Sequence, residues 1–276
     1  MSRPGYSPLT ATDLEMSAVD GRVHHFDSFI QVISPDNPEY YWGNYLLFFE
    51  PPDVDDLPKH IELFHHRFQE FPEVKHVLIR WDGAELSAAV LQQARDLQLV
   101  PDHGFEMTAS SLLDPEPGDL EIRPIEFSTE FESITALNIL CDPKEQKGCA
   151  GYRLFKEGLR RSWRLLAGSQ KMRWWGAYDG DQLVGQCGMV LCSDHRGRYQ
   201  SIETHPEYRR RGICSALVST VGRHAIKSAG CRSVLLGADP KGPAIGLYQR
   251  LGFVIEDTQW GLLSGGESDG LAAEET

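Results

Sequence analysis

Three strand-like segments joined by two very short turns constrain the fold of this chain more than any other feature. The segments cover residues 172–178, 182–193 and 198–204, and the turns contain Asp179-Gly180-Asp181 and His195-Arg196-Gly197. Connections this short and of this composition are typical of β-hairpins. The sequence therefore predicts an antiparallel three-stranded meander in the second half of the 276 residues.

Helical periodicity replaces the strand pattern after residue 211. Apolar residues recur at helical spacing across 212–229, and Gly230 stands where a helix C-cap is expected. A short buried strand at 233–236, a helix opened by Pro243 and a final strand at 253–263 follow. With a strand at 120–124 and a helix at 151–167 upstream, the second half is predicted to be a mixed α/β unit, not a doubly wound one.

The first half repeats part of this order. It predicts a strand at 40–49, a helix at 54–71, a strand at 74–81, a helix at 85–99 and a strand at 104–113. Gly104-Phe105 leads the last of these strands, as Gly252-Phe253 does at the end of the chain. We interpret this as a weak internal repeat, with two unrelated α/β stretches as the alternative.

Charge and composition indicate where the domains divide. Residues 1–115 hold 7 basic and 19 acidic residues, whereas the remainder holds 20 and 21. Paired prolines and Gly-Asp within 114–119 are typical of a linker. We therefore predict one domain at 1–115, a second at 116–263, and a disordered acidic tail at 264–276.

Composition also excludes several classes of protein. The net charge of −13 disfavours a nucleic-acid partner. The longest apolar run is residues 45–49, which is too short to span a membrane, and the N-terminus lacks the pattern of a secretory signal. Six cysteines without a C-x-x-C pair predict reduced thiols in a cytoplasmic protein. His60, His65 and His66 lack the spacing of a metal pair, so we expect a solvated helix face and no metal.

The most informative chemistry lies between the third meander strand and the following helix. Three arginines, Arg209, Arg210 and Arg211, precede Gly212 at the predicted helix start. A helix N-terminus presents unpaired backbone N–H groups and a positive dipole, and glycine lets the backbone approach an anion. With fork-shaped arginine donors beside it, this loop predicts a phosphate or pyrophosphate site rather than a solvated basic turn.

This stretch resembles the acetyl-CoA signature of the GCN5-related N-acetyltransferases, R/Q-x-x-G-x-G/A. The matching residues are Arg209-x-x-Gly212-x-Cys214, and Pro-Glu-Tyr precedes them. Ala244-Ile-Gly-Leu-Tyr-Gln-Arg-Leu-Gly-Phe253 is similar to the same family's A-x-x-L-Y-x-x-x-G-F segment. The resemblance covers about half the chain, and the first half looks like a degenerate, partial copy, as in tandem-type members.

The resemblance implies the roles of individual residues. Acetyl-CoA would be the acyl donor, with its pantetheine arm on backbone groups around Thr204. The pyrophosphate-binding residues would be Arg209, Arg210, Arg211, Gly212, Ile213, Cys214, Ser215 and Ala216. Tyr248 would lie near the thioester sulfur and protonate the leaving thiolate.

Two features modify this assignment. Cys214 stands where glycine or alanine is usual, and a thiol at a helix N-terminus beside arginines should have a lowered pKa. We interpret it as a tolerated small residue rather than a nucleophile, because no His/Asp pair accompanies it. The equivalent loop of the first half, residues 49–56, has four acids, no arginine and no glycine, which predicts one cofactor site per chain.

An amine acceptor needs a general base, because ordinary alkylamines are protonated at neutral pH. Glu203 is the only carboxylate in the strand that leads into the loop, so it is the candidate. A structural carboxylate paired with a nearby arginine is the equally weighted alternative, and His205 is a lesser candidate because a proline follows it. Arg153, Lys156, Arg160 and Arg164 form a stripe that is predicted to be a solvated or docked helix face.

The sequence thus predicts an N-acetyltransferase that moves an acetyl group from acetyl-CoA to a primary amine by direct attack in a ternary complex. A non-catalytic acyl-CoA-binding regulatory module and an acyltransferase using a longer acyl-CoA are the alternatives. The acceptor would be a small molecule or a peptide amine, with no nucleic acid or membrane partner. The chain could be a monomer or a homodimer.

Overall fold

The computed structural model describes residues 6–114, 120–142 and 150–264. The chain divides into two compact units. Unit 1 contains the chain up to Phe105, Leu154–Leu159 and the chain from Asp257, while unit 2 contains Glu106–Arg153 and Arg160–Glu256. The proposed linker at 115–119 and the proposed tail from 265 lie outside the described residues. The division of the sequence into domains at residue 115 stays a prediction.

Unit 2 is built on the predicted meander. Strand order runs β5-β10-β9-β8-β7-β6, and the strands are β5 (Val100–Ala109, which enters from unit 1), β6 (Glu121–Pro124), β7 (Met172–Asp179), β8 (Gln182–Cys192), β9 (Arg196–Thr204) and β10 (Ser233–Ala238). Neighbours from β6 to β9 pair antiparallel, whereas β9 and β10 are parallel. The predicted mixed α/β fold is confirmed.

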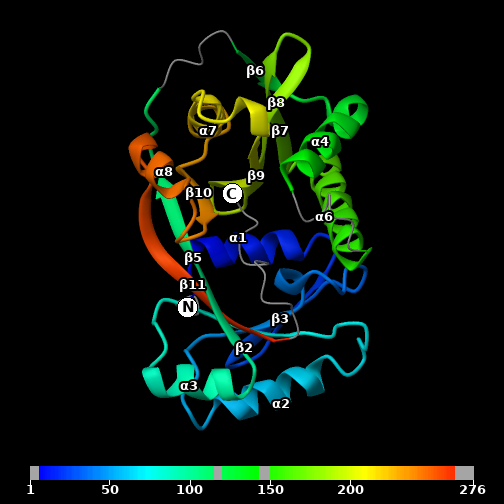
Figure 1. Ribbon diagram of the computed structural model, residues 1–276, viewed down its shortest axis with the longest axis vertical. Helices are drawn as coiled ribbons and strands as arrows, with labels where there is room; N and C mark the ends of the chain where they lie inside the picture. Colours follow the sequence, from blue (N-terminus) through cyan, green and yellow to red (C-terminus); the bar gives the residue numbers. More distant parts are fainter. Residues whose placement is uncertain (1–5, 115–119, 143–149, 265–276) are drawn as a thin grey trace. The chain divides into compact units, whose positions relative to one another are not determined.

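Helices cover both faces of this sheet. They are α4 (Phe127–Cys141), α6 (Ala150–Gly168), α7 (Ile213–Lys227) and α8 (Ile245–Leu251). Two neighbours on β8 show the alternation: a Cβ on Gly185 would lie 2.9 Å from Ile213 of α7, while Gln186 Nε2 donates to Ile134 O of α4 at 3.1 Å. Adjacent strand residues point to opposite faces, so α7 and α4 lie on opposite sides of the meander (Figure 1).

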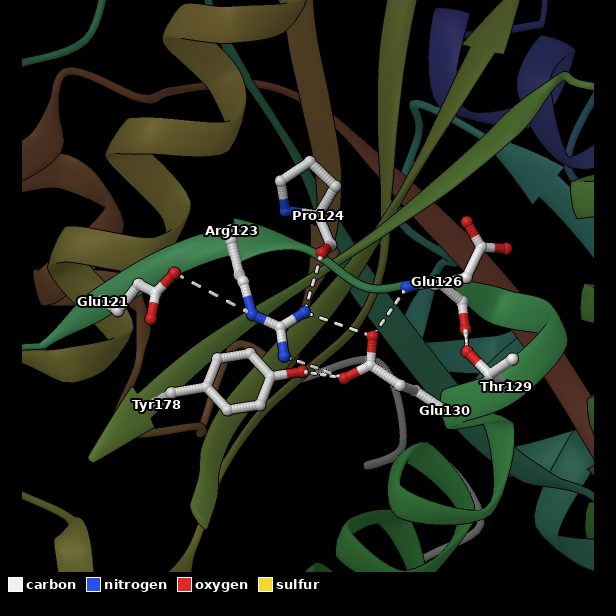
Figure 2. A network of polar contacts seen from close by, with 7 residues as sticks. All are labelled: Glu121, Arg123, Pro124, Glu126, Thr129, Glu130 and Tyr178. Carbon is white, nitrogen blue, oxygen red and sulfur yellow. Dashed lines mark hydrogen bonds and ion pairs between the residues drawn. The ribbon is translucent and has the colours of Figure 1, made fainter. Parts of the chain in front are cut away.

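A polar clamp fixes the start of α4 to the outer strands of unit 2 (Figure 2). Arg123 of β6 donates two hydrogen bonds to the Glu130 carboxylate, at 3.1 and 2.9 Å. Tyr178 of β7 donates to the same carboxylate at 3.0 Å, and its ring lies 4.0 Å from the Arg123 guanidinium carbon. The Arg123 hydrogen bonds, supported by the Glu126 amide, lower the pKa of Glu130 to about 2.

The strands of unit 1 follow the order β1-β2-β3-β4-β11 within the one mixed sheet. They are β1 (Arg22–His25), β2 (Phe29–Ile33), β3 (Tyr45–Phe48), β4 (Val77–Asp82) and the later part of β11 (Val254–Ser264). β3 and β4 are parallel, and the remaining neighbours are antiparallel. The last predicted strand thus continues from unit 2 into the sheet of unit 1, where Gln259 to Ser264 pair with β4.

Three helices complete unit 1: α1 (Pro8–Ser17), α2 (Leu57–Arg67) and α3 (Ala88–Asp96). α2 and α3 pack on an apolar cluster that includes Phe64, Trp81 and Val90. α1 is tied to β4 because Asp82 accepts hydrogen bonds from the Ser7 amide at 2.7 Å and the Thr10 hydroxyl at 2.9 Å.

The predicted strand at 40–49 is wrong in its first half. Residues Tyr41–Gly43 form a 3-10 turn, and only Tyr45–Phe48 pair as a strand. The cause is the buried amide of Asn44, which donates to Asn37 O at 3.0 Å and Tyr40 O at 2.9 Å and accepts from Ser34 N at 2.9 Å. These bonds bend the backbone into a turn before β3 begins.

Candidate functional site

The loop between β9 and α7 has a backbone that turns twice into the left-handed region. After a short 3-10 turn (Pro206–Tyr208), Arg210 has φ +67° and Gly212 has φ +80°. His205 begins this turn, and its Nδ1 accepts a hydrogen bond from Glu207 N at 3.2 Å. His205 therefore has a capping role here.

The start of α7 is open to solvent and presents backbone donors. The first helical hydrogen bond runs from Ala216 N to Gly212 O at 3.0 Å, so the amides of Ile213, Cys214 and Ser215 precede the hydrogen-bonded ladder. No heavy atom lies within 4 Å of the position that a Cβ on Gly212 would take. This combination of free amides and open space suits an anion.

Arginine side chains surround this opening, and two of them are held in place by the protein. Arg209, Arg210 and Arg211 are all exposed. Arg209 Nε donates to Thr204 O at 3.3 Å, and the Arg211 guanidinium carbon lies 4.7 Å from the centre of the Tyr208 ring. Of the predicted cofactor residues, Arg209 to Gly212 thus form an exposed, positively charged rim at the N-terminus of α7, whereas the side chains of Ile213 and Ala216 are buried beneath it.

β9 and β10 separate directly below this loop. Their parallel ladder runs from Arg196/Ser233 to Arg198/Leu235, and within the described residues it stops there. The rest of β9 faces β10 without pairing to it. An unpaired strand edge offers backbone N–H and C=O groups to any extended ligand with amide groups.

A β-bulge accompanies the separation. Gln200 pairs with Gly188 and Glu203 pairs with Gln186, so two residues of β9, Ser201 and Ile202, stand opposite one residue of β8. Ser201 has φ +46°. Bulges bend a strand and increase its twist, which gives a local reason for β9 to leave β10. The sequence gives no sign of this bulge, because Ser201 is neither glycine nor asparagine.

Glu203 is held by amides on the α4 side of the sheet. Asn138 of α4 and Gln186 of β8 donate to its two carboxylate oxygens. Arg160 of α6 donates to Asn138 Oδ1 at 2.7 Å and is 7% exposed. The arginine thus reaches Glu203 through Asn138, and these amide donors stabilise the charged carboxylate.

Sequence reasoning missed Asn138, Gln186 and Arg160 as members of this network. Asn138 lies in an otherwise apolar helix segment, which is the one available signal for a buried polar role. Arg160 belongs to a stripe predicted to be a solvated or docked face, and its buried side chain excludes the solvated alternative at this position. A charged side chain is rarely buried without partners, and here Asn138 satisfies part of its donor capacity.

Thr204 ends β9 beside the loop. Its carbonyl accepts from Arg209 Nε and, at 3.4 Å, from Cys141 Sγ. The Thr204 carbonyl is therefore occupied by this chain's own donors. Gly185 pairs with Thr204 across β8, and His205 N donates to Val184 O at 2.9 Å. These contacts fix the point from which the basic loop starts.

Tyr248 of α8 lies inside unit 2, near the first turn of α7. It is 1% exposed, and its ring makes an edge contact with Phe253 at 5.8 Å between centroids. Burial, with the nearby Cys214 and Cys187 thiols, raises the pKa of Tyr248 well above its usual value of 10.0. The phenol therefore keeps its proton at neutral pH.

The expectation of a lowered pKa at Cys214 is wrong. Burial raises the pKa of this thiol to about 12, because desolvation penalises the thiolate. The arginines of the loop are exposed to solvent, where their effect on the thiol is screened. Cys214 is thus a protonated, small apolar side chain, consistent with a tolerated substitute for glycine or alanine.

Neither a metal-binding cluster nor a membrane-spanning helix is found in the described part of the chain. Within residues 6–114, 120–142 and 150–264, no three His, Cys, Asp or Glu side chains are arranged to hold a metal ion. In the same ranges, no helix has the length and apolar character that would be needed to span a membrane.

Comparison with protein families shows what the segment that carries this site is similar to. Residues 170–255 match the family model described as the acetyltransferase (GNAT) domain. This segment is a GNAT acetyltransferase domain. It contains the meander from β7 to β9, the basic loop, α7, β10 and α8, and so the full set of predicted site residues from Glu203 to Tyr248.

Solved structures share the fold over most of the chain. A protein of unknown function from Staphylococcus epidermidis is similar with a TM-score of 0.72 and 17% identity, over 89% of this chain and 94% of that one. A GCN5-related N-acetyltransferase from Kribbella flavida has a TM-score of 0.67 and 14% identity, over 94% of both chains. A tandem GNAT protein of the clavulanic acid biosynthesis pathway has a TM-score of 0.51 and 14% identity, over 81% of this chain and 74% of that one. At these identities the likeness concerns the fold alone.

Proposed function

We propose that this protein is an N-acetyltransferase that transfers an acetyl group from acetyl-CoA to a primary amine, by direct attack within a ternary complex. The GNAT domain at 170–255 supports acetyl transfer as the reaction class. Donor, acceptor and mechanism are the proposal. A small molecule or a peptide would carry the amine, and we propose a cytoplasmic location.

The observation that carries this proposal is the strand separation directly below an exposed, basic helix start. The β9–β10 ladder ends at Arg198, and the loop that follows β9 carries Arg209 to Gly212. An extended donor with a pyrophosphate at one end needs these two features side by side. The open position at Gly212 leaves room for the phosphate groups against the backbone.

We assign donor binding to residues 204–216 of this chain. The amides of Ile213, Cys214 and Ser215 and the guanidinium groups of Arg209 to Arg211 would hold the pyrophosphate, and Ala216 closes the first turn of α7 behind them. The free edge of β9 up to Thr204 would hold the pantetheine arm through backbone groups other than the Thr204 carbonyl, which accepts from Arg209 and Cys141. When bound, acetyl-CoA would supply an activated acetyl group as a thioester.

We assign the proton transfers to Tyr248 and Glu203. The amine nitrogen attacks the acetyl carbon, the carbon–sulfur bond breaks, and Tyr248 donates its phenol proton to the departing sulfur. Its raised pKa keeps that proton available at neutral pH. Glu203 accepts the proton that the amine loses, directly or through water.

One observation favours the non-catalytic alternative. Both oxygens of Glu203 accept hydrogen bonds from amide groups, as the oxygens of a purely structural carboxylate would. A protein that only binds acyl-CoA needs Glu203 in no other role. The buried phenol of Tyr248 favours the enzyme, because a binding module needs no proton donor at the sulfur. A longer acyl donor is compatible with the same machinery.

Release of free thiol from acetyl-CoA in the presence of mixed primary amines tests the proposal. We expect amine-dependent thiol release that disappears in Arg209→Ala and persists in Arg95→Ala, which removes an exposed arginine from α3 of unit 1. Saturable acetyl-CoA binding without any thiol release across the amine panel would establish the binding module instead.

A further inference from the structure

A pocket in unit 1 is lined by two arginines, although unit 1 is rich in acidic residues. Its volume is about 330 Å³, and it is lined by residues of β1, β2, the end of α2 and the turn that follows. Arg22 and Arg67 line it together with His24 and His66, and Glu70 is its one acidic residue. Residues 1–115 hold only 7 basic residues against 19 acidic ones, so two arginines in one pocket are a marked local concentration.

The floor of the pocket follows from the β1–β2 register. Arg22 pairs with Ile33 and His24 pairs with Gln31 in the antiparallel ladder. Residues directly opposite each other, and residues two apart on one strand, point to the same face. The four side chains therefore form one patch, with two basic residues on β1 beside a polar and an apolar residue on β2.

Gln31 holds Arg67 in place over this floor. The Gln31 side chain is 2% exposed, and its Oε1 accepts from Arg67 Nε at 3.1 Å and Nη2 at 3.0 Å. Its Nε2 donates to Arg67 O at 2.9 Å, which satisfies a carbonyl at the end of α2. The Arg67 guanidinium carbon also lies 4.1 Å from the centre of the Phe26 ring. This arginine is thus oriented before any ligand arrives.

Neither arginine has a carboxylate partner in the described part of the chain. Arg22 lies 5.6 Å from the centre of the Phe71 ring, and no ion pair involves Arg22, Arg67 or Glu70 within residues 6–114, 120–142 and 150–264. In a unit rich in acids, two guanidinium groups beside a cavity and without a carboxylate partner in the described residues are the donors that an external anion requires. Arginine forks match carboxylate and phosphate oxygens in pairs.

We propose that this pocket binds a small organic anion with a carboxylate or phosphate group. The Arg22 and Arg67 guanidinium groups would bind the anionic end, and Ile33 and Phe71 provide apolar wall for carbon atoms of the ligand. A volume of about 330 Å³ is at the lower end of small-molecule sites, which span roughly 300–1,000 Å³. The site lies wholly in unit 1 and does not depend on the function proposed for the GNAT domain.

Histidine-selective NMR and calorimetry on the full chain test this proposal. The probes are citrate for carboxylates and inorganic phosphate for phosphates, each titrated at constant ionic strength with potassium chloride. We expect a saturable shift of the His24 and His66 ring signals, assigned with His24→Gln and His66→Gln, for at least one probe. The stronger probe identifies which oxyanion the pocket takes.

Charge-matched variants make the result specific. Arg22→Gln should weaken the binding seen at His24 and His66 at least tenfold, because charge-assisted hydrogen bonds are lost. Arg95→Gln removes one exposed charge from the same unit outside the pocket and should leave it unchanged. Arg209→Ala disables the loop of the GNAT domain and should also leave these signals unchanged, which separates this proposal from the acetyl-CoA site.

Two results would overturn the proposal. One is the absence of a saturable shift with either probe. The other is an equal loss of binding in Arg22→Gln and Arg95→Gln, which would mean that the anions respond to net charge and not to this pocket.

Discussion

Each unit of the chain contains one parallel strand–helix–strand crossover, and the two differ where a ligand would bind. In unit 1 it is β3–α2–β4, and in unit 2 it is β9–α7–β10. Both send a helix away from the carboxyl end of a strand, so both place a helix N-terminus at a strand end. The same backbone plan therefore appears twice, with two different loops.

The loops differ in what occupies the helix start. In unit 1, the Asp53 carboxylate accepts hydrogen bonds from the amides of Asp55 and Asp56, both at 2.8 Å, just before α2 begins. A protein carboxylate thus takes the position that an external anion would need. In unit 2, Gly212 stands at the start of α7 with open space beside it and three arginines before it.

The ladders differ as well. β3 and β4 pair at Leu46 and Leu47, close to the end of β3, whereas β9 and β10 stop pairing at Arg198, six residues before β9 ends at Thr204. Only the second crossover leaves a strand edge free beneath its loop. The two crossovers share a backbone plan and differ in the bulge at Ser201 and in loop composition, so our proposed donor site depends on these two features and not on the fold alone.

We expect the largest effect from substituting Gly212, the residue that leaves the loop before α7 open. Gly212 has φ +80°, which is costly for a β-branched residue. Gly212→Val should therefore distort the loop, fill its open side and weaken acetyl-CoA binding by about 100-fold or more, since several charge-assisted contacts are lost together. Calorimetry measures this.

A matched variant separates backbone strain from loss of the site. Gly180, in the turn between β7 and β8, has φ +59° and also has no heavy atom near a hypothetical Cβ. Gly180→Val should cost similar stability but leave acetyl-CoA affinity within about twofold, because it lies outside the loop. Equal loss of affinity in both variants would contradict the site.

The next largest effect concerns Tyr248, which lies in α8, the helix that follows the crossover of unit 2. α8 carries Tyr248, whereas its counterpart α3 has no tyrosine. Tyr248→Phe keeps the ring and its contact with Phe253 and removes only the proton donor, so kcat should fall at least tenfold (about 1.4 kcal/mol in the barrier). Acetyl-CoA affinity should not change, because the interaction strengthens only as charge develops on sulfur.

Steady-state kinetics with an amine substrate measure this, under conditions in which chemistry limits the rate. If Tyr248→Phe changed neither kcat nor affinity, the hydroxyl would have no part in the reaction and the residue would serve packing alone.

The smallest expected effect concerns the polar contacts that attach α1 to the strands of unit 1 and α4 to the strands of unit 2. Unit 1 uses half-buried Asp82, and unit 2 uses the half-buried Arg123–Glu130 clamp. The pKa of Glu130 is lowered to about 2, so its stabilising contribution is present above the carboxyl's unfolded pKa and is lost as pH falls toward 2. Glu130→Gln should lower Tm by roughly 2–4 °C at neutral pH, with the difference shrinking below about pH 4.5.

Glu132→Gln provides the control, because Glu132 is an exposed residue of the same helix outside the clamp. Thermal unfolding of both variants is followed from pH 7 to pH 3. Equal changes in Tm for Glu130→Gln and Glu132→Gln across this range would contradict a stabilising role for the clamp.

Local patterns predicted most elements of unit 2 but not the irregularities that make its site. Hairpin turns and helical periodicity correctly predicted β7 to β9, α7, β10, α8 and β11, and Gly230 has the positive φ of a C-cap. The bulge at Ser201 and the burial of Cys214 depend on contacts between strands and helices distant in sequence. No local pattern encodes them, so the separation of β9 from β10 and the direction of the Cys214 pKa shift could not be predicted.

The first forty residues show a different limit. α1 and the β1–β2 hairpin were not predicted, because Phe29–Ile33 is buried on both faces and so shows no alternation, and α1 lacks an apolar stripe. The polar lining of the unit 1 pocket arises only when β1, β2 and the end of α2 come together. The internal repeat is consistent with the two parallel crossovers, since the order of their elements is the same.

The central claim is that acetyl-CoA binds at the β9–α7–β10 crossover of unit 2 and not at the β3–α2–β4 crossover of unit 1. The stoichiometry of acetyl-CoA binding tests this claim most directly. Titration of the full-length protein in a calorimeter, with the active concentration fixed independently, should give one site per chain, and Gly212→Val should remove that site. A stoichiometry near two, or one site that survives in Gly212→Val and is lost when the Asp53 loop of unit 1 is altered, would contradict the account.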